Sequence, residues 1–454
     1  MLLPFSFSSQ ALSATTSGMI HGSAPYLTFD GRRMTDTSGF LWITISDAAG
    51  NKQTFTPTTN PSSESNPIEL LNPNDKFTNV EMLVATDSSS IPLNSVVNSF
   101  PNYWGDDDGD GQGSGGITAT GNLNLTIKDK YNKTVARNES LDICKAPYKV
   151  TLSATDGELK TEYGIPQNSN FSASSVDYYI NPKLPPKVCF VRPNLTYSVG
   201  SYDGPISIWN PDKGFIPQSI VPSSYNLNFP TTGANNLYFD LEVGGSVGHL
   251  SWMIVPSRVG SIEISVRPAD YAAKNVRVIL SGPYIPESRM NSSTPGPAAQ
   301  PSLPARFELV GTDIDNKGIK VKYGFELKQW FVHRGTVADN YSNSLSWCSH
   351  IGYRLPKVRD LTNAVCAGLG SGSWCQGAVG ATPSSPVNHY QRRIGAGFFT
   401  EWGNMNDYTH ANFLYDHYWT TDTTGITQFL VASATGYVRD RSLDSMAYSV
   451  CTTP

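Results

Sequence analysis

The chain has 454 residues, of which 39% are hydrophobic and 11% aromatic, and this is ample for globular domains. At about 150 residues per domain, it predicts roughly three of them. Only 16% of the residues are charged and the net charge is -5, so nucleic acid is not an expected partner. No apolar stretch approaches the ~18 residues that a membrane helix requires, so no transmembrane segment is expected.

Residues 1–14 predict the remnant of a secretory signal peptide. Leu2–Phe7 is a short apolar block, and Ser9-Gln10-Ala11 resembles a small-residue cleavage site. The basic segment that usually precedes such a block is missing, so a disordered N-terminus is the alternative.

Residues 15–146 predict a first β-sandwich-like domain. Residues 40–45 and 122–127 are rich in strand-forming side chains, and the second segment alternates apolar and polar residues as a half-buried strand does. No amphipathic helix is expected in this region.

An acidic cluster lies within this first region, at residues 106–111. Asp106, Asp108 and Asp110 alternate along the chain with a glycine nearby, and such carboxylates can wrap a calcium ion. The segment is no EF-hand, because position twelve is Ile117 and not a glutamate. A structural calcium site is therefore one interpretation, and a solvated acidic turn is the other.

Residues 147–286 predict a second β-sandwich-like domain. Its predicted strands are each followed by turn residues, at the spacing of an all-β sandwich. They cover residues 149–152, 237–243, 250–255, 262–266 and 276–280. Residues 287–304 then predict a linker, because Pro, Ser and Ala at this density favour an extended spacer.

Residues 305–454 predict a third domain that mixes helices and strands. A strand at residues 330–332 precedes a helix at 341–351, which Gly352 is placed to end. A second helix is expected at 357–367. Later strands are expected at 414–421, 428–432 and 447–451.

Six cysteines indicate structural disulfides in an oxidising compartment, and buried thiols in a reduced protein are the alternative. Cys144 and Cys189 are predicted to pair, because the other four cysteines can pair among themselves. Four cysteines allow three connectivities, so the residues leave the pairing of the rest open.

Three motifs near the end of the chain carry a resemblance to a known fold. They are Trp347-Cys348-Ser349-His350-Ile351-Gly352-Tyr353-Arg354-Leu355-Pro356, Tyr418-Trp419-Thr420-Thr421-Asp422 and Val450-Cys451. This part resembles a C-type-lectin-like domain, a fold that usually displays a binding surface. The resemblance implies a Cys348–Cys451 disulfide, which leaves Cys366 and Cys375 to close a small loop. The calcium-dependent sugar motifs of the family do not stand here.

The complete pattern is mainly β, with two Ig-like/β-sandwich-type domains followed by an α+β C-type-lectin-like domain. This order resembles the passengers of the intimin/invasin adhesins, and the block from Tyr103 to Gly111 looks like a module of enterobacterial adhesin-like proteins. The resemblance implies a secreted or bacterial-surface adhesin whose partner is a protein or glycan on a host cell or bacterial surface. The alternatives are a secreted regulatory protein that binds its own outer-membrane export barrel, and an exoenzyme with an accessory lectin-like module.

The stretch from Pro386 to Tyr418 supplies the candidate binding residues, since it concentrates aromatic and arginine side chains that dominate binding hot spots. In the lectin-like fold it corresponds to the long loop, the usual ligand surface. We expect ligand contacts from Tyr390, Arg392, Arg393, Trp402 and Tyr408, and a role in the core is the alternative. No nucleophile elbow or nucleotide fingerprint appears, so no catalytic residues, no enzyme activity and no catalytic cofactor are expected.

Overall fold

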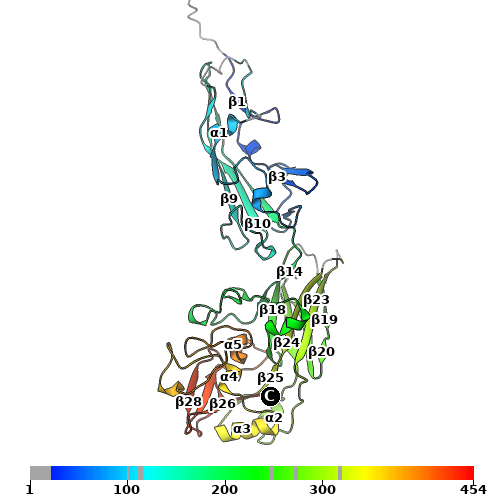
Figure 1. Cartoon of the computed structure of the whole chain (residues 1–454), viewed down its shortest axis with the longest axis vertical. Coiled ribbons are helices and arrows are strands. Elements are labelled where there is room, and N and C mark those ends of the chain that lie inside the picture. Colours follow the sequence, from blue (N-terminus) through cyan, green and yellow to red (C-terminus); the bar gives the residue numbers. More distant parts are fainter. Residues whose placement is uncertain are drawn as a thin grey trace, which may run out of the picture. The chain divides into compact units, whose positions relative to one another are not determined.

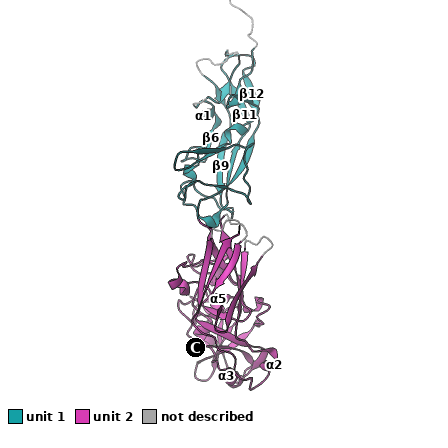
Figure 2. Cartoon of the chain, turned by 90° about the vertical axis from the view of Figure 1, so that its right-hand side faces the viewer, with its two compact units in different colours: residues 1–184 teal, residues 185–454 magenta. Residues whose placement is uncertain are grey.

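The computed structural model describes residues 22–99, 102–107, 109, 116–245, 250–269, 275–314, 318 and 320–453. The chain forms two compact units, residues 1–184 and residues 185–454, which Figure 2 shows in different colours. Each unit is described by itself. Among the described residues, no helix combines the length and the apolar character needed to cross a bilayer.

The regular structure of unit 1 is mostly short strands, which pair antiparallel except for β5 with β13 (Figure 1). Its largest sheet has five strands in the order β5, β13, β10, β9, β6. The bounds in this sheet are Ile68–Glu69 for β5, Ser174–Asn181 for β13, Tyr148–Ala154 for β10, Asn122–Lys128 for β9 and Ser90–Pro92 for β6. A five-residue helix, α1 (Leu93–Val97), follows β6 directly.

Three smaller sheets complete unit 1. The first joins β2 (Arg32–Met34), β1 (Tyr26–Phe29) and β7 (Trp104–Gly105). The second joins β12 (Asn168–Phe171), β11 (Gly157–Lys160) and β8 (Thr118–Ala119). The third is the hairpin of β3 (Ile43–Ser46) and β4 (Lys52–Phe55).

The core of unit 1 lies on one face of the five-stranded sheet. β10 alternates buried and half-buried residues along its whole length, which places Tyr148, Val150 and Leu152 inside. From β13, Tyr178 is fully buried, and its hydroxyl donates to the carbonyl of Leu41 at 2.6 Å. The predicted alternation at residues 122–127 is confirmed in β9.

The predicted domain boundary between residues 146 and 147 is wrong. β10 begins at Tyr148 and pairs with β9 from Lys128 to Leu123, so both strands lie in the same sheet. Because neighbouring strands share backbone hydrogen bonds, a boundary between them would cut one ladder. Unit 1 instead extends to residue 184.

Unit 2 begins with a seven-stranded sheet in the order β15, β16, β14, β18, β22, β21, β20. The bounds are Trp209–Asn210 for β15, Gly214–Phe215 for β16, Lys187–Arg192 for β14, Tyr238–Gly244 for β18, Asn275–Ser281 for β22, Ile262–Pro268 for β21 and Arg258–Val259 for β20. A three-stranded sheet of β19 (Leu250–Val255), β23 (Ala305–Asp313) and β24 (Lys320–Leu327) accompanies it.

The later part of unit 2 is built on a six-stranded sheet, here called the C-terminal sheet, in the order β17, β25, β29, β26, β27, β28. Its bounds are Thr232–Ala234 for β17, Gln329–Asp339 for β25, Ala447–Thr452 for β29, His417–Thr423 for β26, Gln428–Ala432 for β27 and Val438–Arg441 for β28. Four short helices occur in unit 2: α2 (Glu287–Met290), α3 (Tyr341–His350), α4 (Val358–Leu361) and α5 (Phe398–Trp402).

Two local predictions about these helices can be compared with the structure. α3 begins where predicted and ends at His350, one residue before its predicted limit, and Gly352 adopts a φ of 80°, a conformation that glycine tolerates best. The second helix, predicted at 357–367, ends already at Leu361. Beyond it the Asn363 backbone amide donates to the Thr400 hydroxyl and the Val365 amide donates to the Val387 carbonyl, and these tertiary bonds replace helical ones.

The predicted separation of a second domain at 147–286 from a third at 305–454 is also wrong. β23 and β24 lie after residue 304, yet β23 pairs with β19. β17 lies before residue 286, yet it pairs in parallel with β25 in the C-terminal sheet. One continuous cluster of buried side chains therefore extends from Val188 to Cys451.

Residues 287–304 do not form the predicted free spacer. Arg289 donates to the carbonyls of Pro295 and Gly296, which folds the segment back on itself. The segment also binds the end of α3, because the Ala298 amide donates to the Ile351 carbonyl at 3.0 Å. A proline-rich segment can therefore pack against a domain as well as form an extended spacer.

The disulfides agree with the pairing that the lectin-like resemblance implied. Cys348 in α3 is bonded to Cys451 in β29, and Cys366 is bonded to Cys375. Cys144 and Cys189 are each disulfide-bonded, and none of the described cysteines is free. The predicted fold class, mainly β with sandwich-type sheets and an α+β C-terminal part, is confirmed, although its last two parts share one core.

Candidate functional site

Four of the five predicted ligand contacts lie in the interior of unit 2. Tyr390, Arg392 and Trp402 have no exposed surface, and Tyr408 is only 2% exposed. A side chain without exposed surface cannot reach a partner, so direct contact by Tyr390, Arg392 and Trp402 is wrong. Tyr408 lines a pocket of unit 2 with its small exposed area, and its contact with a ligand stays a prediction. Arg393 is half-buried, and its guanidinium donates to the Gln391 side chain at 3.3 Å.

Arg392 serves the fold because its guanidinium bonds to backbone carbonyls. Its Nη1 donates to Glu401 at 3.1 Å and its Nη2 donates to Asn194 at 2.8 Å. The guanidinium also lies over the Trp209 ring, 4.9 Å from the centroid. Burial lowers the pKa of Arg392, although its usual value is high enough to keep it charged.

Trp402 and Tyr408 join α5 to earlier segments of unit 2, around Asn194 and Phe229–Thr232. The Trp402 indole donates to the Thr232 carbonyl at 3.1 Å and packs edge-on against Phe229. The Tyr408 hydroxyl donates to the Trp402 carbonyl and accepts from the Asn194 amide. Both rings therefore fill the core under the surface to which they were assigned.

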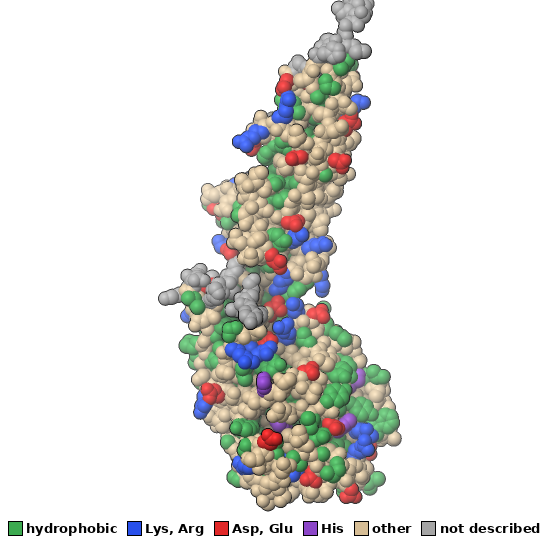
Figure 3. All heavy atoms as spheres, turned by 180° about the vertical axis from the view of Figure 1, so that it is seen from behind, with side chains coloured by type: hydrophobic (Ala, Val, Ile, Leu, Met, Phe, Trp, Pro, Cys, Tyr) green, Lys and Arg blue, Asp and Glu red, His purple; other side chains and the backbone are tan. Residues whose placement is uncertain are grey.

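The stretch from 386 to 418 lines three pockets of unit 2, and apart from Tyr408 it does so through residues that the hot-spot argument did not select. Those residues include His389, Asn412, Tyr415, Asp416 and His417. Tyr415 is 58% exposed, unlike the other aromatic residues at 390–413. On the face of unit 2 visible in Figure 3, hydrophobic side chains and histidines lie next to each other.

The first of these pockets, called here the tyrosine–arginine pocket, has a volume of about 360 Å³. Three neighbouring strands of the C-terminal sheet contribute His417, Ala432 and Arg439. Side chains carried by paired strands are held more rigidly than side chains carried by loops. The remaining lining residues are Tyr202, Gly370, Asn388, His389, Tyr415, Asp416, Ala434, Thr435 and Tyr437.

Several contacts fix the aromatic residues of this pocket. The Tyr202 ring stacks on His389 with centroids 4.0 Å apart. The Tyr415 and Tyr197 hydroxyls are 3.1 Å apart, and this hydrogen bond raises the pKa of Tyr197 to about 12. Burial lowers the pKa of His389, which keeps the stacked ring neutral near pH 7.

The polar residues of the tyrosine–arginine pocket carry opposite charges. Asp416 accepts a hydrogen bond from the His417 amide at 2.7 Å and lies 3.3 Å from the His417 Nδ1. Burial lowers the pKa of His417, while Asp416 acts in the opposite direction and the nearby Arg439 and Arg441 lower it further. Arg439 is half-buried, and among the described residues its Nε has no hydrogen-bond acceptor.

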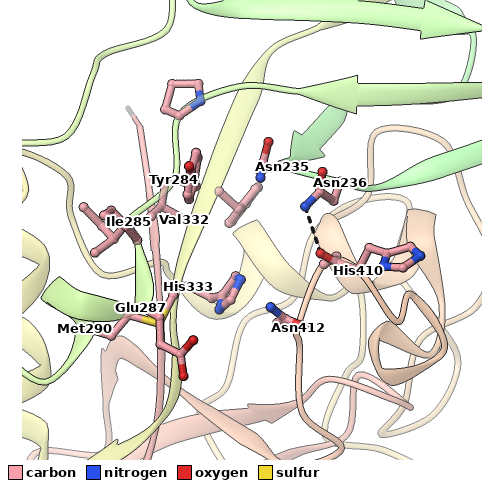
Figure 4. A pocket seen from close by; sticks show the side chains of 14 residues that line it. Asn235, Asn236, Tyr284, Ile285, Glu287, Met290, Val332, His333, His410 and Asn412 are labelled. Carbon is pink, nitrogen blue, oxygen red and sulfur yellow. Dashed lines mark hydrogen bonds between the residues drawn. The ribbon is translucent and has the colours of Figure 1, made fainter.

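A second pocket, called here the asparagine pocket, has a volume of about 410 Å³. Figure 4 shows Glu287, Asn412 and His333 around it, and the Asn236 side chain donates to the His410 carbonyl at 2.9 Å. Its lining contains one carboxylate, from Glu287, and no lysine or arginine. The two pockets therefore differ in charge.

The structure describes only one of the three predicted calcium-binding residues. Asp108 and Asp110 lie outside the described residues, and Asp106 is described. The neighbouring Asp107 forms an ion pair with Arg33 and accepts a hydrogen bond from the Tyr26 hydroxyl. No group of three His, Cys, Asp or Glu side chains that could hold a metal occurs among the residues that the structure describes, and the calcium site stays a prediction.

Comparison with known proteins places the chain near bacterial adhesins. No protein-family model matches the sequence. Over 131 residues, 28% of this chain, it is 27% identical to the inverse autotransporter adhesin YeeJ of Escherichia coli K12. The chain is similar to a bacterial adhesin. The predicted adhesin resemblance is thereby confirmed as a similarity, and this match spans 4% of the length of YeeJ.

Two solved structures of adhesins also resemble the chain, each at 12% identity. The first is invasin, a bacterial integrin-binding protein. The match covers 74% of this chain and 51% of the invasin chain, with a TM-score of 0.37. The second is the 282-residue C-terminal fragment of intimin, solved in complex with the intimin-binding domain of the translocated intimin receptor. The match covers 76% of this chain and 96% of the intimin fragment, with a TM-score of 0.33. Both TM-scores lie below 0.5.

Proposed function

We propose that this chain is a secreted or bacterial-surface adhesin that binds a protein or glycan on a host cell or bacterial surface. The contact would be made by the C-terminal part of unit 2, which we assign to the C-type-lectin-like class. The local similarity to a bacterial adhesin supports the proposal. The helix-to-last-strand disulfide between Cys348 and Cys451 supports the lectin-like assignment.

One observation carries the choice of surface. Tyr415 is 58% exposed and lines the tyrosine–arginine pocket together with Tyr202 and Tyr437. Tyrosine brings a large contact area with few rotatable bonds, and such residues dominate the binding energy of interfaces. A pocket lined by tyrosines and by side chains of paired strands is therefore a rigid place for a partner to dock.

The experiment measures binding of the fluorescently labelled full chain to cultured epithelial cells and to Gram-negative bacteria, by flow cytometry. Tyr415→Ala removes the exposed ring and is expected to weaken binding by at least tenfold. Tyr163→Ala is the matched control, because Tyr163 is 55% exposed but belongs to unit 1.

Two results would contradict the proposal. The first is that the chain binds neither class of cell. The second is that Tyr163→Ala weakens binding as much as Tyr415→Ala does, because the loss could then not be assigned to the C-terminal part of unit 2. A circular dichroism melt of each variant separates lost binding from lost folding.

A further inference from the structure

Arg439 is the unusual residue of the tyrosine–arginine pocket. It comes from β28, the edge strand of the C-terminal sheet, and its side chain is half-buried. Among the described residues, no carboxylate lies within ion-pair distance of it, and its Nε is shielded from water without an acceptor. A guanidinium held in this way lacks the partner that partly buried cations normally have.

The other charged group of the pocket does not neutralise Arg439. Asp416 is engaged by the His417 amide at 2.7 Å and faces its Nδ1 at 3.3 Å. Arg441 on the same strand adds positive charge near His417. Arg439 therefore presents to the pocket a positive charge that is unpaired among the described residues, and the partly exposed Asp416 and His417 side chains keep room for hydroxyl groups.

The neighbouring rings narrow the chemistry of that anion. Tyr415 and Tyr437 line the pocket and offer faces on which the C–H groups of a sugar ring can stack. A volume of about 360 Å³ lies within the range of small-ligand pockets and accommodates a sugar residue. Carboxylates, like phosphates, match the planar fork of an arginine, and the carboxylate is the acidic group of the common acidic sugars.

We propose that the tyrosine–arginine pocket binds a carboxylate-bearing sugar residue, with the carboxylate on Arg439, the ring against Tyr415 or Tyr437, and hydroxyls on Asp416 and His417. This inference rests on the proposed function and names the chemical class of the ligand at the same site. An acidic peptide would satisfy Arg439 equally. Its acidic side chain has no ring to stack on Tyr415 or Tyr437, so the sugar is favoured.

The test uses the full chain and isothermal titration calorimetry with four probes. Glucuronic acid and glucose share one ring and differ in the carboxylate, N-acetylneuraminic acid is a second acidic sugar, and a capped glutamate peptide represents acidic protein. Arg439→Gln removes the charge and keeps most of the side-chain length. Glu287→Gln is the control, because it alters a single charge in the asparagine pocket.

We expect at least one acidic sugar to bind, glucose to bind at least tenfold more weakly, and Arg439→Gln to reduce acidic-sugar affinity at least tenfold. Glu287→Gln should leave that affinity unchanged. The inference is overturned if neither acidic sugar binds, if glucose binds as well as glucuronic acid, or if the peptide binds more tightly than both sugars. Equal affinity of Arg439→Gln and the unaltered chain would overturn it as well.

The same variants separate this inference from the proposed function. A chain that binds cells, and still does so with Arg439→Gln, keeps the proposed function and loses the sugar. A chain that binds an acidic sugar but no cell keeps the pocket chemistry and loses the adhesin role. Thermal melts show whether Arg439→Gln is folded, and Arg439→Lys, which keeps the charge without the fork, replaces it if it is not.

Discussion

The carboxylate of Glu401 in α5 accepts a hydrogen bond from the Thr232 hydroxyl of β17 at 2.6 Å, although 169 residues separate them. The Thr232 amide and the Thr231 amide and hydroxyl donate to the same carboxylate. Glu401 is fully buried and these donors replace its water. Residues on either side of the predicted linker are thus parts of one packed structure.

The first prediction concerns independent folding. A fragment of residues 305–453 lacks β17, β19 and the Thr231–Thr232 donors, so we expect it to be insoluble or to lack a cooperative unfolding transition. A fragment of residues 185–453 keeps the complete buried cluster and is expected to unfold cooperatively. Urea unfolding followed by tryptophan fluorescence measures both, and a cooperative transition in the shorter fragment would contradict the shared core.

The second prediction separates core residues from surface residues within the 386–418 stretch. Trp402→Ala removes a fully buried indole and should cost about 3–5 kcal/mol of unfolding free energy. Tyr415→Ala, at a 58% exposed site, should change it by about 0.5 kcal/mol or less. Denaturant unfolding of the two variants gives both values, and similar losses would show that Tyr415 also supports the core.

The third prediction compares the two disulfides of unit 2. The Cys348–Cys451 bond joins residues 103 apart, and the Cys366–Cys375 bond joins residues 9 apart. In the chain-entropy model the longer loop stabilises by about 5 kcal/mol and the shorter by about 2–3 kcal/mol. Replacing each pair with alanines and measuring unfolding free energies should therefore give the larger loss for the pair that includes Cys451. The reverse order would indicate that strain or residual structure outweighs loop length.

The fourth prediction concerns pH. His333 lines the asparagine pocket, accepts a hydrogen bond from the Gly335 amide at 2.9 Å on Nδ1, and burial lowers its pKa to about 4. The unfolded chain takes up this proton near pH 6.5, before the folded chain does. The stability that neutral His333 contributes is therefore present above pH 6.5 and is lost as the pH falls towards 4.

His333→Gln isolates this contribution, because glutamine does not titrate. Between pH 7.5 and pH 4.5, the unaltered chain should lose about 2 kcal/mol more unfolding free energy than the variant. This value is smaller than the complete shift in the pKa of His333 would give, because the ring lines a pocket open to water, which weakens the effect of burial. Parallel pH dependence of the two proteins would exclude His333 as the titrating group.

Local elements could be predicted from the sequence because their signals are local. β19 and β27 have the predicted bounds, and α3 ends one residue before its predicted limit. Alternation defines a strand, and Gly352 marks the end of a helix, without knowledge of the neighbours. The Cys348–Cys451 bond came from family resemblance and not from spacing.

Domain boundaries and binding residues could not be predicted, because both depend on which segments meet in space. Nothing in Thr232–Ala234 indicates that this segment pairs with Gln329–Phe331. The aromatic residues and arginines at 390–413 have the composition of a hot spot, and tertiary packing decides which of them are covered. Arg439 stands outside that stretch, and only its place on the edge strand beside His417 and Tyr415 brings it into the pocket.

The position of β29 has a consequence for how unit 2 matures. This strand is the last of unit 2 in the sequence, yet it lies inside the C-terminal sheet, between β25 and β26. The two halves of that sheet have no shared ladder until residues 447–452 arrive. During synthesis or export with residue 1 leading, the C-terminal sheet would stay incomplete until β29 emerged. Only then could the disulfide between Cys451 of β29 and Cys348 of α3 form.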